Sequence, residues 1–315
     1  MLLPLPCQTP EEAVAELQGI RDDCRAHGIV QLDGYLCNAL AETRFAQGRF
    51  RAAAVLFREN LSNGDPSPPA TRRDSVLGLA RVLARVDSLE AALALLDRQS
   101  SLFRTGDPLD MVEYRLALGQ ALQQAGRLEE ALFELIATER EADRLGQRAA
   151  RIQALSGAAQ VAGRLGDPER SLSYGRRALE VWESERGLPE DPAWREVRGA
   201  AAAEVVTGMG ATLLEYPPDV PEAERARIAF DAVQVLKSRT LMERILGPTG
   251  AETPALRLSP TSCADLQETV LHPGELLLDF YLGAETSLLF AVSAEDCRAF
   301  RLPALRQLEP VLLPY

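Results

Sequence analysis

The sequence contains one lysine, Lys237, and its other basic residues are arginines. Codon bias in a GC-rich genome explains this scarcity best. Acidic residues outnumber basic ones, and the net charge at pH 7 is −12. Such a charge repels phosphate backbones and anionic lipids, so we expect neither nucleic acid nor a membrane surface as a partner. Arginine bonds carboxylates through two N–H groups at once, so the surface can carry many ion pairs.

Cysteine and histidine are also scarce, and their spacing excludes several kinds of site. No two cysteines have the Cys-x-x-Cys spacing of a zinc or redox motif, and the two histidines lie far apart in the sequence. We therefore expect reduced thiols, no disulfide framework, no metal site and no cofactor. The residues concerned are Cys7, Cys24, Cys37, Cys263, Cys297, His27 and His272.

Long apolar runs are missing, and none reaches the length needed to cross a membrane. The opening MLLPLPCQTP has leucines before Cys7, but it lacks a basic start and its apolar stretch is too short for a signal sequence. These features predict a cytoplasmic protein. The segment TGMG at 207–210 lacks the lysine of a phosphate-binding loop, so we expect its glycines to permit close helix packing instead.

What the sequence does contain is a repeat of 39 to 40 residues. Each copy reads as an apolar helix, a short turn and a second helix, as in LALGQALQQAGRLEEALFEL. Three columns keep the same steps of 39, 39 and 40 residues. The turn column is Gly48, Asp87, Gly126 and Gly166; the small column after it is Ala53, Ala92, Ala131 and Ser171; the small column before it is Ala41, Ala80, Gly119 and Ala159.

Each column has a physical reason. The residue after a helix end often needs a positive φ, which glycine adopts at the lowest cost and Asp87 tolerates. Small residues let the two helices of a hairpin approach closely. One hairpin cannot bury its apolar face alone, so the hairpins must stack.

This pattern resembles the tetratricopeptide (TPR) family over residues 32–185, although its period is longer than the usual one. Gly175 departs from the pattern, because the second helix normally has a large side chain there, and Tyr174 is the expected substitute. Residues 1–31 read as a capping helix or degenerate half-repeat. We expect the array to span 32–246, with an extended final hairpin at 192–246 formed by helices over 192–215 and 222–246, and a linker at 247–261.

After the linker the chain changes to strands, expected at 275–282, 286–293 and 297–302. Leu276, Leu278, Phe280 and Leu282 share one face of the first strand, and Leu277, Asp279 and Tyr281 share the other. So thin a layer is stable only when it packs on a helix, for which 222–246 is the best candidate. An exposed strand edge near Ala299–Leu302 favours self-association, for example as a homodimer.

The order of long helix, linker and DLQETVLHPGELLLDFYLGAETSLLFAVSAEDCRAFRLP resembles the start of a CHAT domain. This is a caspase-like cysteine peptidase domain that usually follows TPR arrays. The resemblance implies that 262–315 is the N-terminal part of such a domain. The catalytic His and Cys of the family lie beyond these strands, so no catalytic residue is assigned and this chain is not expected to be active by itself.

The resemblances together imply a mainly α fold: a right-handed superhelix of TPR-like hairpins followed by a small antiparallel β meander. They imply a regulatory scaffold, the TPR sensor region of a caspase-like peptidase, that binds a protein or peptide. A stand-alone TPR adaptor without enzymatic activity is the alternative. A self-sufficient enzyme that uses His272 with Cys263 or Cys297 is the weakest hypothesis.

In TPR proteins the first helix of each hairpin lines the concave groove. The polar residues that follow the small column before the turn, on the first helix of each hairpin, are therefore the predicted ligand-binding residues. They are Glu42, Arg81, Arg85, Gln120, Gln123, Gln124, Gln160 and Arg164. Their arginines and glutamines suit an extended or acidic peptide. The alternatives are that these side chains are merely solvated, or that a neighbouring segment of the protein covers them.

Overall fold

The computed structural model describes residues 10–29, 32–62, 68–86, 88–183, 205–215, 219–246, 262–283, 286–305 and 307–308. The chain divides into two compact units, Met1–Ala150 and Arg151–Tyr315, and each is described by itself. Asp87, most of the predicted helix over 192–215 and the predicted linker at 247–261 lie outside the described residues. Within them, no helix is both long and apolar enough to cross a membrane.

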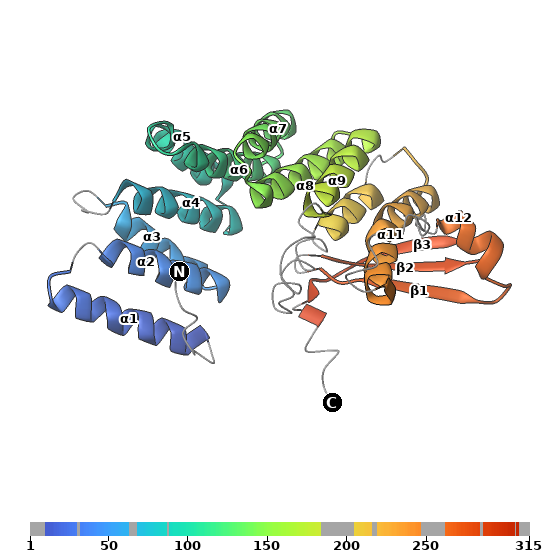
Figure 1. Ribbon diagram of the computed structural model, residues 1–315, viewed down its shortest axis with the longest axis horizontal. Helices are drawn as coiled ribbons and strands as arrows, with labels where there is room; N and C mark the ends of the chain where they lie inside the picture. Colours follow the sequence, from blue (N-terminus) through green and yellow to red (C-terminus); the bar gives the residue numbers. More distant parts are fainter. Residues whose placement is uncertain are drawn as a thin grey trace. The chain divides into compact units, whose positions relative to one another are not determined.

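The first unit is a stack of helical hairpins that follows the repeat in the sequence (Figure 1). A single helix comes first, in the segment predicted to be a capping helix or degenerate half-repeat, and three hairpins follow it. The helices are α1 (Pro10–Ala26), α2 (Asp33–Ala46), α3 (Phe50–Asn60), α4 (Pro69–Arg85), α5 (Leu89–Arg104), α6 (Pro108–Gln124) and α7 (Leu128–Arg144).

The repeat columns have the structural roles that the sequence predicts. Gly48 and Gly126 end their helices with φ angles of 72° and 77°, in the left-handed region where a side chain is strained. Ala53, Ala92 and Ala131 are fully buried between the helices of their hairpins. Each small residue therefore marks a place where two helices approach too closely for a larger side chain.

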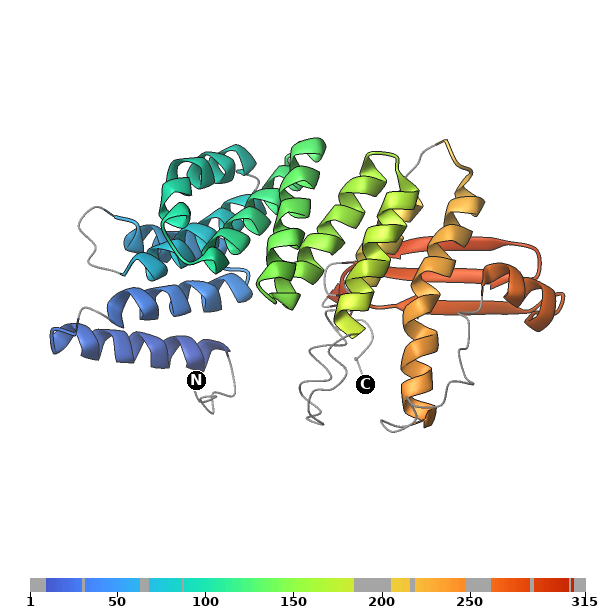
Figure 2. The same ribbon diagram turned by 45° about the horizontal axis from the view of Figure 1, so that its top comes forward.

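The first and second helices of the hairpins do not pack equally closely along the stack. The first helices of successive hairpins pack on one another, α2 on α4 and α4 on α6, whereas the second helices, α3, α5 and α7, make few or no contacts with each other. An array whose first helices are closer together than its second helices curves with the first helices on the inside. The second helices are consequently splayed apart on the outer side of this unit (Figure 2).

A four-residue charge network attaches the capping helix α1 to the first hairpin. Arg21 and Arg25 both contact Asp33 of α2 and Glu59 of α3, at distances of 2.7 to 2.8 Å. Arg21 is only 3% exposed, so its charge depends on these carboxylates for compensation. Burial alone would raise the pKa of Asp33, but the hydrogen bonds from Arg21 and Arg25 outweigh it and hold that pKa at about 2.

The second unit begins with a fourth hairpin, α8 (Arg148–Arg164) and α9 (Pro168–Glu183). A helix at 205–215 and α11 (Glu222–Leu246) follow. Gly175, the departure from the repeat, leaves a gap that the sulfur of Met209 fills: a Cβ at Gly175 would lie 2.2 Å from it. The compensating side chain thus comes chiefly from the next helix rather than from the neighbouring Tyr174.

The strands form a three-stranded antiparallel meander in the order β1-β2-β3, close to the predicted ranges. They are β1 (Leu276–Tyr281), β2 (Ser287–Ser293) and β3 (Cys297–Leu302), with Phe280 opposite Leu289 and Ala299 opposite Phe290. A short helix, α12 (Cys263–Asp265), continues into a single π-helical turn (Leu266–Val270) and precedes the sheet. The predicted mainly α fold with a terminal β meander is confirmed.

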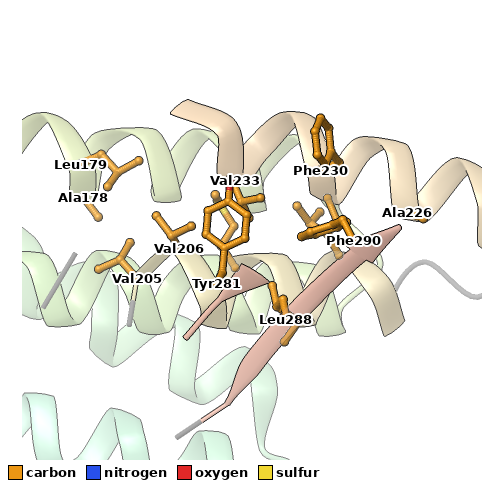
Figure 3. Close-up of a cluster of buried hydrophobic side chains, with 14 of the residues drawn as sticks. Ala178, Leu179, Val205, Val206, Ala226, Phe230, Val233, Tyr281, Leu288 and Phe290 are labelled. Carbon is orange, nitrogen blue, oxygen red and sulfur yellow. The ribbon is translucent and has the colours of Figure 1, made fainter. Parts of the chain in front are cut away.

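The sheet shares one hydrophobic core with the helices of this unit (Figure 3). Phe290 of β2 meets Phe230 of α11 edge to face, with ring centroids 5.4 Å apart. Gln234 of α11 donates a hydrogen bond of 2.7 Å to the buried carboxylate of Asp279 in β1. The expectation that the sheet packs on the helix at 222–246 is therefore confirmed, and α11 runs across the strands (Figure 2).

The two faces of the sheet differ in a way that the sequence pattern did not reveal. The mixed face, with Asp279 and Tyr281, is buried against the helices. The more apolar face is exposed, with Leu276, Leu278 and Phe280 between 50% and 60% accessible. Alternation along a strand separates two faces, but only the partners of the strand decide which face becomes the core.

Gly210 marks the tightest junction in this unit. A Cβ there would lie 2.6 Å from Leu288 of β2 and 3.0 Å from Val233 of α11. This observation supports the prediction that the glycines of TGMG permit close packing.

We predict that Gly210→Ala lowers the free energy of unfolding by about 1–3 kcal/mol, because buried side chains must move to admit the methyl group. Gly19→Ala is the matched control, because Gly19 is an exposed residue of α1 and nothing approaches the added Cβ within 4 Å. That substitution should raise stability by about 0.5–1 kcal/mol. Urea unfolding followed by circular dichroism measures both, and equal effects of the two substitutions would contradict the packing described for Gly210.

The Arg21–Asp33 contact predicts a pH dependence. Because the pKa of Asp33 is lower in the folded chain than in the unfolded chain, its stabilising contribution is complete above pH 4 and is lost as the pH falls towards 2. At pH 7, Asp33→Asn should lower the free energy of unfolding by about 2 kcal/mol. At pH 3, the difference in unfolding free energy between the wild type and this variant should be smaller by about 1 kcal/mol. Urea titrations at both pH values check this, and a difference that does not change with pH would argue against the network.

Candidate functional site

Six of the predicted ligand-binding residues lie in the first unit, on α2, α4 and α6. Glu42 and Arg81 form an ion pair with each other between α2 and α4, and the guanidinium of Arg81 lies 5.5 Å from the centre of the Phe45 ring. Arg85 and Gln124 are exposed, while Gln120 and Gln123 are half-buried. Part of the charge on the inner surface, which the first helices α2, α4 and α6 form, is therefore neutralised by contacts within the unit. The role of this surface in binding a peptide stays a prediction.

Gln160 and Arg164 lie on α8 in the second unit, and both are half-buried. The amide nitrogen of Gln160 lies 2.6 Å from the position that a Cβ at Gly208 would occupy. The helix at 205–215 thus passes over Gln160. At this residue the structure favours the alternative in which a neighbouring segment of the chain covers the predicted site.

The inner surface of the first unit also carries two carboxylates that the sequence analysis did not select, Asp74 on α4 and Glu113 on α6. Although Asp74 is exposed as a residue, loss of water around its carboxyl group, followed by the negative charge of Glu113, raises its pKa to about 6. The pKa of Glu113 is raised as well, by burial and then by the charge of Asp110. The carboxyl groups of Asp74 and Glu113 therefore make this surface less favourable for an acidic ligand than Arg81 and Arg85 alone would.

On the outer side of the same unit, a groove of about 630 Å³ lies between α5, α6 and α7. Its floor is apolar and consists of Leu93, Tyr114, Leu118 and Leu122. Phe133 of α7 stands on one wall with 68% of its surface exposed. An exposed aromatic side chain beside an apolar groove is characteristic of a surface that binds another molecule.

The rim of the groove is acidic. Five carboxylates line it, from Glu90, Asp97, Glu129, Glu130 and Glu134, against the single guanidinium of Arg127. Arg127 is already held by Glu130 through two hydrogen bonds of 2.6 and 2.7 Å. Glu134 is paired with Arg115 at 3.4 Å. Within the described part of the chain no ion pair reaches Glu90, Asp97 or Glu129, although the charge of Glu90 is close enough to Arg127 to interact with it. These three residues are exposed at the rim.

Tyr114 fixes the floor of the groove in place. Its ring stacks on Phe103 with centroids 4.9 Å apart, and its hydroxyl donates a hydrogen bond of 3.3 Å to the carbonyl of Leu96. Burial, followed by the charges of Asp97 and Glu134, raises the pKa of Tyr114, so the phenol remains neutral at physiological pH. The floor is therefore rigid and uncharged below a charged rim.

The thiols that the enzymatic hypothesis would use are both buried. The hydrogen bond between Cys263 and Cys297 lowers the pKa of Cys263 and raises that of Cys297, and burial opposes ionisation of either thiol. His272 lies exposed in the turn before β1, where its backbone N–H bonds Glu275. Within the described residues no hydrogen bond joins an imidazole to a cysteine, and no group of three or more acidic, histidine or cysteine side chains could hold a metal ion.

Comparison with known proteins shows the fold alone. The structure is similar to the crystal structure of BtubC (BKLC) from P. vanneervenii, with a TM-score of 0.55 and 17% sequence identity. The similarity covers 80% of this chain and 97% of that one. No family model matches the sequence, and no curated protein matches it either.

The groove was not predicted from the sequence, because only the first helix of each hairpin was expected to line a binding surface. One signal could have revealed it. The outward column on the second helices reads Val55, Ala94 and Phe133 at steps of 39 residues, so a small residue on α5 faces a large aromatic one on α7. Such a change within a repeat column shows where one repeat presents a different surface from its neighbours.

Proposed function

We propose that this chain is a protein-binding scaffold that recognises a segment of a partner in the groove between α5, α6 and α7. The observation that carries this proposal is the groove itself, in which an apolar floor and the exposed ring of Phe133 meet in one cavity of about 630 Å³. Curvature of the array supports it, because splayed second helices leave room for a segment from another protein. The volume lies within the range of typical ligand sites.

Filling the groove should abolish binding. Ala94 lines it and is exposed, so Ala94→Trp should occupy the cavity without disturbing the buried face of α5. Peptides selected from a displayed random library against the wild-type protein should bind this variant at least about tenfold more weakly, measured by fluorescence anisotropy.

Val55→Trp is the matched control, because Val55 occupies the same repeat position one hairpin earlier and is also exposed. It should leave binding unchanged. Failure of the library to yield any peptide, or equal binding of the selected peptides to wild type and Ala94→Trp, would overturn the proposal.

A second and more specific role is that of the regulatory region of a caspase-like peptidase, as the resemblance to a CHAT domain implies. The exposed apolar face of the sheet favours it. Leu276, Leu278, Phe280 and Phe300 form a surface that soluble proteins normally cover with a further layer. The remainder of a peptidase domain would supply that layer, together with the catalytic Cys and His.

The length of the natural gene product tests this second role. We expect further residues after Tyr315 that include a cysteine and a histidine, and mass spectrometry of the protein isolated from its source organism would detect them. A natural protein that ends at Tyr315 would contradict the peptidase role and leave the stand-alone adaptor as the explanation.

A further inference from the structure

The two acidic residues of α5 at the rim have no counterpart on α3. The residues 39 positions before Glu90 and Asp97 are Arg51 and Arg58, so these two positions carry the opposite charge on α3. The column that contains Glu90 continues with Glu129 and Glu169, so it is acidic from α5 onwards. The floor differs too, since the residue that corresponds to Tyr114 is Ser75. Because α3 and α5 have the same packing role in their hairpins, stacking does not explain this reversal.

We propose that the groove between α5, α6 and α7 binds a cationic amphipathic segment of a partner protein, one that presents apolar side chains flanked by arginine or lysine. This inference rests on the proposed function and specifies its ligand. Apolar side chains of the segment lie on Leu118 and against the exposed ring of Phe133. Basic side chains pair with the carboxylates of Glu90, Asp97 and Glu129, which no ion pair within the described residues holds.

Two physical arguments support this class of ligand. A carboxylate at the edge of an apolar groove attracts a cation more strongly than an isolated surface carboxylate does, because the bound segment excludes part of the water around it. A cation can also lie over the face of Phe133, which an anion cannot do favourably. An acidic segment would meet five carboxylates, of which only Glu130 and Glu134 are paired with arginines among the described residues, so it is disfavoured.

The test uses the full chain and two fluorescent peptides of about four helical turns that share one pattern of leucines and differ only in having lysine or glutamate at the other positions. The lysine peptide should bind at least about tenfold more tightly than the glutamate peptide, and its affinity should fall as salt is raised. A third peptide, with serine in place of leucine, should bind weakly, since it cannot use the floor.

The decisive variant is Glu90→Arg with Asp97→Arg, because it installs the residue type that the preceding repeat already carries at these positions and should fold normally. It should weaken binding of the lysine peptide by about tenfold or more. A matched control, Glu268→Arg with Glu295→Arg, changes the net charge equally at exposed sites of the other unit. Circular dichroism checks the folding of both variants.

The outcomes separate this inference from the proposed function. Loss of binding in the groove variant but not in the control supports a cationic ligand. Equal loss in both variants indicates general attraction to an acidic protein and overturns the inference. A further outcome is that the library peptides contain no basic residues and still lose binding to Ala94→Trp. In that case the scaffold function stands and the inference about a cationic ligand is wrong.

Discussion

The constraint on which the structure depends is that a pair of helices cannot bury all of its apolar side chains alone. Every later part of the chain within a unit covers a surface that an earlier part leaves open. Small residues such as Ala53 and Ala92 set how closely the helices of one hairpin approach, and contacts between successive first helices set the curvature. The splay of the second helices, and with it the outer groove, follows from that curvature.

In the second unit the same requirement is met by different means. Regular repetition stops after α9, and Met209 fills the gap that Gly175 leaves in the expected pattern. The sheet then completes the core through Phe290 and its contact with Phe230. This explains how a meander of three short strands is stable here: its mixed face belongs to a helical core, and Gln234 donates a hydrogen bond to one oxygen of the buried Asp279 carboxylate.

Charge distinguishes the two surfaces that could bind a partner. On the inner surface, Arg81 is paired with Glu42, and loss of water around Asp74, followed by the charge of Glu113, raises the pKa of Asp74. On the outer surface, an acidic rim surrounds an apolar floor, and the two rim positions on α5 correspond to arginines on α3. Packing of the array demands neither this change of charge nor the exposed ring of Phe133, and the proposed binding role would use both.

The hairpins, their boundaries within a few residues, the helix before them and the order of the strands are predictable from the sequence, because they follow from local periodicity, turn glycines and small residues at a constant step. The sequence also indicates that Gly208 and Gly210 permit close packing. Three features depend on the folded chain instead. They are the choice of the buried face of the sheet, the filling of the gap at Gly175 by Met209, and the groove formed by α5, α6 and α7. Each of these depends on side chains that are distant in the sequence, and a periodic pattern does not say which distant surfaces meet.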